Sequence, residues 1–498
     1  MAPYATALVL IGIAGLFWLD RRDKWTSKAN LIPFTWLLIA MSRPVSAWLT
    51  ASAPADASLR AEAYLEGSPL DRSILIVLLG LAIRVLWTRR QAALAILRVN
   101  APIILFLLYC LASISWADFP VVSFKRWIRA VGDVLMILVI LTDTHPENTL
   151  KSIISRIGYL LVPTSILFIR FFPELGRVYT VGGRATWTGV CTDKNALGAL
   201  CMIVGTVVLW RLLNLRGVSG GSGGRAAKSA ALAAVFLMVV YLLPLVDSKT
   251  AQMCFVFATV VVLFRFFRLP FVSFPFTVGT VAVCYAVLVL GVGSDALEVI
   301  GRESTLTGRT TVWEQVLRFV HDPPPGVEPV SSVVGAGYES FWVGERVIRL
   351  RRYGGNQAHN GYLEIYVNLG WMGLMFLGIV IAAGYRSLIA DRRTNPDLSR
   401  LKLAFFVICL TYNFSEAAFK MMSPVWMMFL WATLSTPAPQ TVSVPGQERR
   451  RSDGPVTSRS LPAARVRSVS GPVARRSQRP HAVLPLGEKR PSLSRGDA

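Results

Sequence analysis

One histidine and a group of basic residues have side chains suited to group-transfer chemistry. His359 stands directly before the apolar run 361–385, and an imidazole there can accept a proton near neutral pH. Several of the segments that connect the apolar runs contain basic residues, whose guanidinium and ammonium groups can bind anionic oxygens. These basic residues are Lys125, Arg126, Arg129, Arg177, Arg184, Lys194, Lys249, Arg302, Arg309 and the group Arg346 to Arg352. Together they predict an anionic ligand beside a general base.

The elements that position these residues are apolar helices. The chain has 498 residues, 53% hydrophobic and 16% charged, with a mean hydropathy of +0.50, which is typical of a membrane protein. Four apolar runs, 152–172, 195–213, 229–246 and 361–385, approach the roughly 20 residues that cross a bilayer, and nine shorter or proline-broken runs bring the total to thirteen. The thirteen runs are 4–19, 31–49, 73–87, 101–116, 130–141, 152–172, 195–213, 229–246, 250–264, 271–291, 361–385, 401–416 and 424–434. We therefore predict an all-α polytopic membrane protein with about 12 or 13 transmembrane helices and one large extracytoplasmic loop.

The formal net charge of +23 follows the positive-inside rule and does not indicate a nucleic-acid partner. Five basic clusters alternate with the runs so that all fall on one side, which we assign as cytoplasmic. They are Arg21, Arg22 and Lys24; Arg89, Arg90 and Arg98; Arg211, Arg216, Arg225 and Lys228; Arg265 and Arg268; and Arg386, Arg392, Arg393, Arg400 and Lys402. The first run lacks a cleavage site, so we expect it to be retained as a first span.

Five segments are predicted along the chain: N-terminal helices (1–100), a central bundle (101–291), an extracytoplasmic loop domain (292–358), C-terminal helices (359–435) and a disordered basic tail (436–498). The loop domain contains an amphipathic pattern over 309–320, expected to form a helix along the membrane surface. The tail serves as a topological anchor, or it attracts lipid headgroups or a partner. For each outward basic residue taken singly, snorkelling at the interface is the competing explanation.

Metal and disulfide chemistry are not indicated. The six cysteines are scattered and the four histidines are dispersed, so neither forms a metal-binding pattern. We predict no metal and no cofactor.

Several short motifs carry a family resemblance. From His359 the chain reads H-N-G-Y-L-E-I-Y-V-N-L-G-W-M-G, with His359, Asn360, Gly370 and Gly373 at the positions of a His, Asn/Ser/Gln, nine residues, Gly, two residues, Gly pattern. Six further short motifs precede His359 in the chain, in this order: S-I-S-W-A-D at 113, R-A-T-W-T-G at 184, D-K-N-A-L-G at 193, D-S-K-T-A at 247, G-R-T-T-V-W at 308 and G-A-G-Y-E-S-F-W at 335. Over about 101–434 the chain resembles the superfamily of O-antigen ligases and Wzy-type polysaccharide polymerases, and most closely the exopolysaccharide polymerases.

The resemblance implies transfer of a glycan from an undecaprenyl-diphosphate carrier to a sugar hydroxyl. His359 and Arg184 are then the predicted catalytic residues, with Arg309, Lys194 and Lys249 binding the diphosphate. Lys249 stands where the family more often has Arg, so a point charge replaces a bidentate fork. Free N–H groups in the helical turn after His359 are also expected to receive phosphate oxygens. The sugar-binding candidates are Asn195, Tyr338, Trp342, Asn360, Glu364 and Glu416, each with a structural alternative, and Glu364 either orients the imidazole or lies at a helix interface.

Three functions are compared. The first is polymerisation of lipid-linked repeat units for exopolysaccharide or O-antigen; the second is ligation of O-antigen to lipid A core; the third is transport of a lipid-linked sugar. A transporter predicts polar residues at mid-membrane and repeated halves, which the sequence does not show. We therefore expect an enzyme of the bacterial inner membrane with its site on the periplasmic face. Its partners would be the lipid-linked glycan, the bilayer, a chain-length regulator and a flippase.

Overall fold

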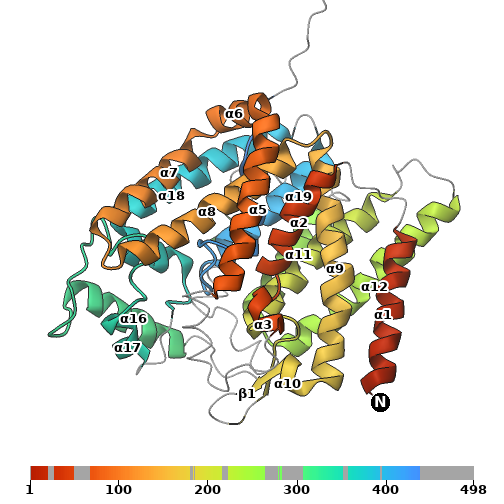
Figure 1. Cartoon of the computed structure of the whole chain (residues 1–498), viewed down its shortest axis with the longest axis horizontal. Coiled ribbons are helices and arrows are strands. Elements are labelled where there is room, and N and C mark those ends of the chain that lie inside the picture. Colours follow the sequence, from red (N-terminus) through yellow and green to blue (C-terminus); the bar gives the residue numbers. More distant parts are fainter. Residues whose placement is uncertain are drawn as a thin grey trace, which may run out of the picture. The chain divides into compact units, whose positions relative to one another are not determined.

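The computed structural model describes residues 2–20, 27–49, 68–179, 183, 185–215, 222–263, 279, 281–282, 307–351, 357–392 and 395–437. Residues 1–438 form one compact unit of helices with one small hairpin (Figure 1). The basic tail from residue 438 onward, the predicted span 271–291 apart from three positions, and the catalytic candidate Arg184 lie outside the described residues.

The helices and strands have the following bounds: α1 Ala2–Leu19, η1 Lys28–Asn30, α2 Leu31–Ala40, α3 Val45–Leu49, α5 Pro69–Thr88, α6 Arg90–Val99, α7 Ala101–Ala112, η2 Ser113–Trp116, α8 Pro120–Leu141, α9 Pro146–Phe171, α10 Pro173–Gly176, β1 Arg177–Tyr179, β2 Ala185–Trp187, α11 Lys194–Leu213, α12 Ser222–Val246, α13 Lys249–Leu263, α16 Thr307–His321, α17 Glu345–Leu350, α18 Gly361–Asp391, α19 Pro396–Tyr412 and α20 Pro424–Thr433. The two strands pair antiparallel, with Val178 opposite Thr186.

Apolar helices dominate, so the chain is an all-α polytopic membrane protein. Within the described part, α1, α9, α11, α12 and α18 are long and apolar enough to cross a bilayer, and α6 with α7 and η2 makes a sixth candidate that bends by 86°. Shorter apolar helices lie at 28–40, 249–263 and 424–433. The predicted total of 12 or 13 spans stays a prediction, because one span falls almost wholly outside the described residues.

Side-chain caps mark where several helices begin. Asp193 accepts the backbone N–H groups of residues 195 and 196 at 2.9 and 3.0 Å, which starts α11. Ser68, Asn395 and Ser423 cap α5, α19 and α20 in the same way, each followed by a proline that suits the first helical turn. The polar residues between apolar runs therefore set the helix boundaries.

Small residues let the central helices approach closely. A Cβ atom on Gly198 of α11 would lie 2.8 Å from the Cβ atoms of Ser248 and Ala251 at the start of α13. On α9, a Cβ atom on Gly158 would lie 2.6 Å from Val204 of α11. The Gly198 contact brings the starts of α11 and α13 together, and the Gly158 contact packs α9 against α11.

Helix α18 is broken at Gly370, where φ is +65° and ψ is −165°. The break frees backbone N–H groups, and two of them find partners in the preceding loop: Trp371 N–H donates to Ser332 O at 3.0 Å and Met372 N–H donates to Val333 O at 3.1 Å. A Cβ atom on Gly370 would lie 2.2 Å from the carbonyl carbon of Val333. Only glycine therefore permits this close approach of loop and helix.

The loop region 307–351 has its own apolar cluster. Val312, Val316, Phe319 and Val320 of α16 are buried in it together with Phe341. Helix α16 covers the range 309–320 that the amphipathic pattern predicted. In Figure 1, α16 and α17 lie at the same end of the bundle as α10 and β1, and α6 lies at the opposite end.

Candidate functional site

His359 is held by the residue that precedes it. Both backbone groups of Ala358 are engaged: its N–H donates to Glu364 Oε1 at 2.6 Å, and its carbonyl accepts Trp313 Nε1–H of α16 at 2.7 Å. Glu364 also accepts the indole N–H of Trp342 at 2.6 Å. His359 itself has φ +48°, an unusual conformation for a residue with a side chain. Glu364 thus orients the backbone before the imidazole.

The first turn of α18 is fully capped. Asn360 Oδ1 accepts the backbone N–H of Tyr362 at 3.0 Å and that of Leu363 at 3.1 Å. The Gly361 N–H donates to the carbonyls of Asn413 and Glu416 at 2.8 and 3.0 Å. The expectation that these N–H groups are free for phosphate is therefore wrong, because Asn360 and the loop after α19 already occupy them.

A buried carboxylate joins His359 to Arg309. The side chain of Glu416 is 5% exposed, its Oε1 accepts Arg309 Nη2–H at 2.7 Å, and its Oε2 lies 3.3 Å from His359 Nδ1. Arg309 also donates to the Ser415 carbonyl. Three segments distant in sequence thus form one group, the His359–Glu416–Arg309 cluster, in which the imidazole and guanidinium remain about a quarter exposed (26% and 25%).

The protonation state of Glu416 follows from its neighbours. Burial acts to raise the pKa of Glu416, but the hydrogen bond from His359 and the charge of Arg309 outweigh burial and hold that pKa below its ordinary value. An ionised carboxylate at Nδ1 favours the tautomer with the proton on Nδ1. The Nε2 lone pair is then available to accept a proton.

Contacts extend from the cluster to the starts of α11 and α13. Thr250 Oγ1 lies 2.7 Å from Ser415 Oγ, next to Glu416. Ser248 Oγ–H donates to Asn195 Oδ1 at 3.1 Å, and the Tyr412 hydroxyl donates to the Asn195 carbonyl at 3.3 Å. Asn195 therefore ties α11 to α13 and α19.

Two predicted cations occupy the first positions of these helices. Lys249 Nζ is 2.8 Å from Asp247 Oδ1, and both side chains are partly exposed. Lys194 is half-buried and makes no hydrogen bond or ion pair with the described part of the chain. Positive side chains at helix N-termini add to the positive end of the helix dipole and favour an anion there. Arg184, directly before β2, lies outside the described residues.

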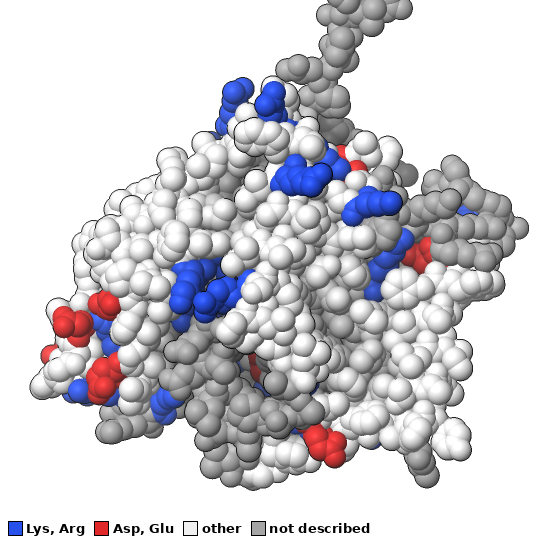
Figure 2. Space-filling model, viewed as in Figure 1, with Lys and Arg blue, Asp and Glu red and all other residues white. Residues whose placement is uncertain are grey.

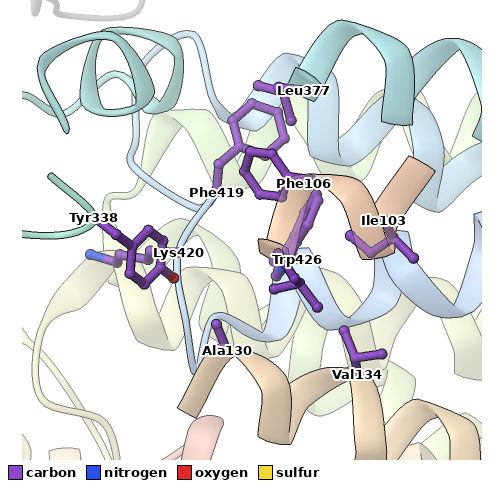
Figure 3. Close-up of a pocket in the computed structure, with 10 residues that line it drawn as sticks. Ile103, Phe106, Ala130, Val134, Tyr338, Leu377, Phe419, Lys420 and Trp426 are labelled. Atoms are coloured by element: carbon purple, nitrogen blue, oxygen red, sulfur yellow. The ribbon is translucent and has the colours of Figure 1, made fainter. Parts of the chain in front are cut away.

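The two aromatic candidates lie in the interior. Tyr338 is 5% exposed, and burial raises the pKa of its phenol well above the ordinary value. Trp342 is 7% exposed and bonded to Glu364. Figure 3 shows Tyr338 and Lys420 on one side of a small pocket, with Phe106, Phe419 and Trp426 on the other. Neither aromatic side chain contacts the His359–Glu416–Arg309 cluster through a hydrogen bond in the described ranges.

Two residues beside His359 were not predicted. Gln357 Nε2 lies 3.3 Å from His359 Nδ1, and Gln357 Oε1 accepts Lys420 Nζ–H at 3.3 Å. Lys420 lies in the loop between α19 and α20, and Asp133 holds this loop because its Oδ2 accepts the Met422 N–H at 2.8 Å. No sequence pattern indicated them, because all these contacts except the first join distant segments. Among the described residues, no three of His, Cys, Asp and Glu converge as metal ligands would.

Comparison with known proteins agrees with the family resemblance. Residues 232–378 match the family described as O-antigen ligase. The chain is 26% identical over 294 residues to the exopolysaccharide production protein ExoQ of Rhizobium meliloti (strain 1021), an alignment covering 56% of this chain and 63% of that protein. The match therefore spans less than two thirds of that relative. The family region includes Lys249, Arg309, His359, Gly370 and Gly373, and the resemblance predicted from the motifs is confirmed.

Proposed function

Because this chain carries an O-antigen ligase family region that includes the histidine motif, we propose that it polymerises undecaprenyl-diphosphate-linked oligosaccharide repeat units for exopolysaccharide or O-antigen. The observation that carries this proposal is the His359–Glu416–Arg309 cluster, which joins a base, an ionised carboxylate and a cation. The multi-pass helical bundle supplies the membrane setting that a lipid-linked donor requires.

The proposed reaction needs one proton acceptor and a stabilised leaving group. An acceptor sugar hydroxyl attacks the anomeric carbon of the donor glycan, and its proton passes to Nε2 of His359. The new glycosidic bond forms as the bond from the anomeric carbon to the diphosphate oxygen breaks, and the lipid diphosphate leaves with that electron pair. Glu416 then stabilises the imidazolium through Nδ1, as a carboxylate does for a catalytic histidine.

Several cations can stabilise the negative charge on the lipid diphosphate as it leaves. Arg309 keeps unused guanidinium hydrogens beyond those that bond Glu416 and Ser415, and its side chain is 25% exposed. Lys194 and Lys249 add charge at the linked helix starts, and we propose that Arg184 completes the clamp as a bidentate ligand. Such a set of cations can perform the role of a divalent metal, so we propose a metal-independent reaction.

Orientation in the membrane follows from the basic clusters. We propose that the site faces the periplasm and that the clusters at the other bundle end face the cytoplasm. Figure 2 shows Lys and Arg side chains at the end where α6 lies, and a further group of them lower on the same face. A cysteine placed at Ser331 should react with an impermeant thiol reagent added to intact spheroplasts; a probe that reacts only after lysis would contradict this orientation.

Polymerisation is favoured over ligation by one comparison. The curated relative is named for exopolysaccharide production, whereas the family is described by the ligase. Both reactions share the donor and the base, so only the acceptor differs. Supplying purified protein with a lipid-linked repeat unit alone, and then with lipid A core, separates the two: a ladder without lipid A core supports the polymerase.

The decisive variants are at His359 and Arg184. His359→Ala and Arg184→Ala should abolish polymer formation at normal protein level, and Arg184→Lys should recover part of it because an ammonium cannot form the bidentate contact. His321 is an exposed histidine at the end of α16, so His321→Ala is the matched control and should leave polymer unchanged. Near-normal polymer from His359→Ala would refute the proposed mechanism.

A further inference from the structure

A hollow of about 520 Å³ opens where α5 meets α6. In Figure 1, α6 lies at the bundle end opposite α16, the helix that carries Arg309 of the His359–Glu416–Arg309 cluster. The walls of the hollow come from the α5–α6 junction and from the segment that joins α8 to α9. The lining residues are Thr88, Arg89, Arg90, Gln91, Ala92, Thr142 and Thr144. Nothing in the proposed polymerase reaction uses this hollow.

Within the part of the chain that the structure describes, two guanidinium groups in the hollow have no carboxylate partner. Arg89 donates to the Val139 carbonyl and to Ser27 Oγ, both at 3.3 Å and both uncharged. Arg90 is exposed, and across the described ranges neither arginine forms an ion pair. Most of their N–H donors therefore remain available to an anion, and two adjacent guanidinium groups suit a phosphate.

The three threonine hydroxyls that line the hollow already donate to protein acceptors, and Thr144 Oγ1–H donates to the Asp143 carboxylate at 3.2 Å. Thr88 Oγ1–H donates to the Val85 carbonyl at 2.7 Å, and Thr142 Oγ1–H donates to the Leu138 carbonyl at 2.8 Å. Their hydrogens are thus committed to their own helices, and their oxygens are left to receive a donor. The hollow therefore suits a ligand that combines anionic oxygens with hydroxyl groups of its own.

The surroundings indicate a lipid. Helix α6 lies at 86° to the axis of α7 and η2, so if α7 crosses the bilayer then α6 runs along its surface. Trp87 and Leu94, on either side of the lining residues, are 71% and 45% exposed. An exposed tryptophan beside a surface helix is typical of the membrane interface, where acyl chains can cover both side chains.

We propose that this hollow binds the phosphoglycerol headgroup of an anionic phospholipid in the leaflet at that end of the bundle. The phosphodiester oxygens accept hydrogen bonds from Arg89 and Arg90, and the glycerol hydroxyls donate to Thr88 and Thr142. The acyl chains pack against Trp87 and Leu94. This site is independent of the polymerase proposal, since none of its residues belongs to that site.

The test uses the full chain purified in detergent, with native mass spectrometry to count bound lipid during titration with phosphatidylglycerol or phosphatidylcholine. The wild-type chain should hold one phosphatidylglycerol molecule more tightly than phosphatidylcholine. Arg89→Gln combined with Arg90→Gln should weaken that binding about 30-fold, since each interfacial charge contributes about fivefold. Arg98→Gln is the matched control, because Arg98 is exposed on α6 but does not line the hollow.

Three outcomes would overturn the proposal. If Arg98→Gln weakens phosphatidylglycerol binding equally, the attraction is diffuse and the hollow is not a specific site. If the double variant binds the lipid as wild type does, the hollow is not the site. If inorganic phosphate at millimolar concentration displaces the lipid, the site binds free anions. If Arg89→Gln lowers the unfolding temperature, Arg90→Gln alone decides, because Arg90 is exposed and its side chain makes no hydrogen bond or ion pair with the described residues. It should then weaken binding about fivefold, and unchanged binding would count against the site.

Discussion

Replacing Glu416 by glutamine separates the charge of the cluster from its shape. A glutamine has the same length and can still accept a hydrogen bond from His359 Nδ1, so the ring can keep its orientation. The negative charge is lost, and with it the partner that Arg309 holds at 2.7 Å. If Glu416 stabilises an imidazolium during the reaction, the variant should lose rate while Arg309 becomes freer to bind the donor.

The expected magnitude follows from the geometry. Glu416 Oε2 lies 3.3 Å from His359 Nδ1, and opposite unit charges about 4 Å apart interact by about 4 kcal/mol at an effective dielectric constant of about 20. His359 is 26% exposed, so solvent screening reduces this interaction to about 2–4 kcal/mol. At 1.36 kcal/mol for each factor of ten, the rate should fall roughly 30- to 1000-fold.

The assay is single-turnover polymer formation by purified protein in liposomes, over a range of lipid-linked donor concentrations. The maximal rate should fall as estimated, while the donor concentration for half-maximal rate should stay the same or decrease. Glu345→Gln is the control, because Glu345 is half-exposed on α17 and, among the described residues, pairs with Arg349 alone at the surface. A maximal rate within about threefold of wild type, or a loss confined to donor affinity, would show that the carboxylate does not act on the base.

Further expectations concern stability. Because the pKa of Glu416 is lowered on folding, its carboxylate contributes stability that is fully present above its unfolded pKa and is lost as the pH falls through the folded pKa. The unfolding temperature of Glu416→Gln should therefore fall less than that of wild type between about pH 5 and about pH 3. An equal fall would contradict this pKa shift. Gly370→Ala should cost at least about 2 kcal/mol, since φ is +65° and the new Cβ would lie 2.2 Å from backbone, while Gly378→Ala in the same helix meets nothing within 4 Å and should be neutral. Thermal unfolding in detergent compares the two, and equal stabilities would refute the clash. Trp313→Phe removes the bond to the Ala358 carbonyl and should lower polymer yield at normal protein level; an unchanged yield would mean that this bond does not position His359.

Local signals in the sequence predicted much of the framework. The apolar run after His359 predicted the helix that follows it, and the apolar spacing from Val312 to Val320 predicted α16, which ends before consecutive prolines. Both are short-range patterns, in which neighbouring residues decide the outcome. The membrane class followed from composition, which needs no knowledge of contacts.

Contacts between distant segments were not predictable in this way. The run 361–385 reads as one continuous span, because apolar composition does not report that Gly370 adopts a positive φ. Glu416 was only one of several sugar-binding candidates, since nothing in a single sequence shows that residues 57 positions apart share a hydrogen bond. The cap by Asn360 was missed for a different reason: an Asn before a helix is a known capping signal, and it was interpreted as a ligand.

The break at Gly370 in α18 and His359 before its first turn are linked by hydrogen bonds to the same loop. These bonds give a physical reason for the spacing between His359 and Gly370 in the histidine motif. The break lets the loop 331–342 bond to α18, through the Phe341 N–H to Asn368 Oδ1 at 3.0 Å. One residue further along that loop, Trp342 donates to Glu364, which in turn receives the N–H before His359. Between Asn360 and the break at Gly370 the helix has nine residues, about 13 Å at 1.5 Å per residue, and the loop contacts it at both ends of this stretch, at Glu364 and at Gly370. A shift of the glycines by one position would turn Glu364 by about 100° relative to the loop and leave Ala358 without its acceptor. The motif therefore specifies where His359 stands as well as which residue it is.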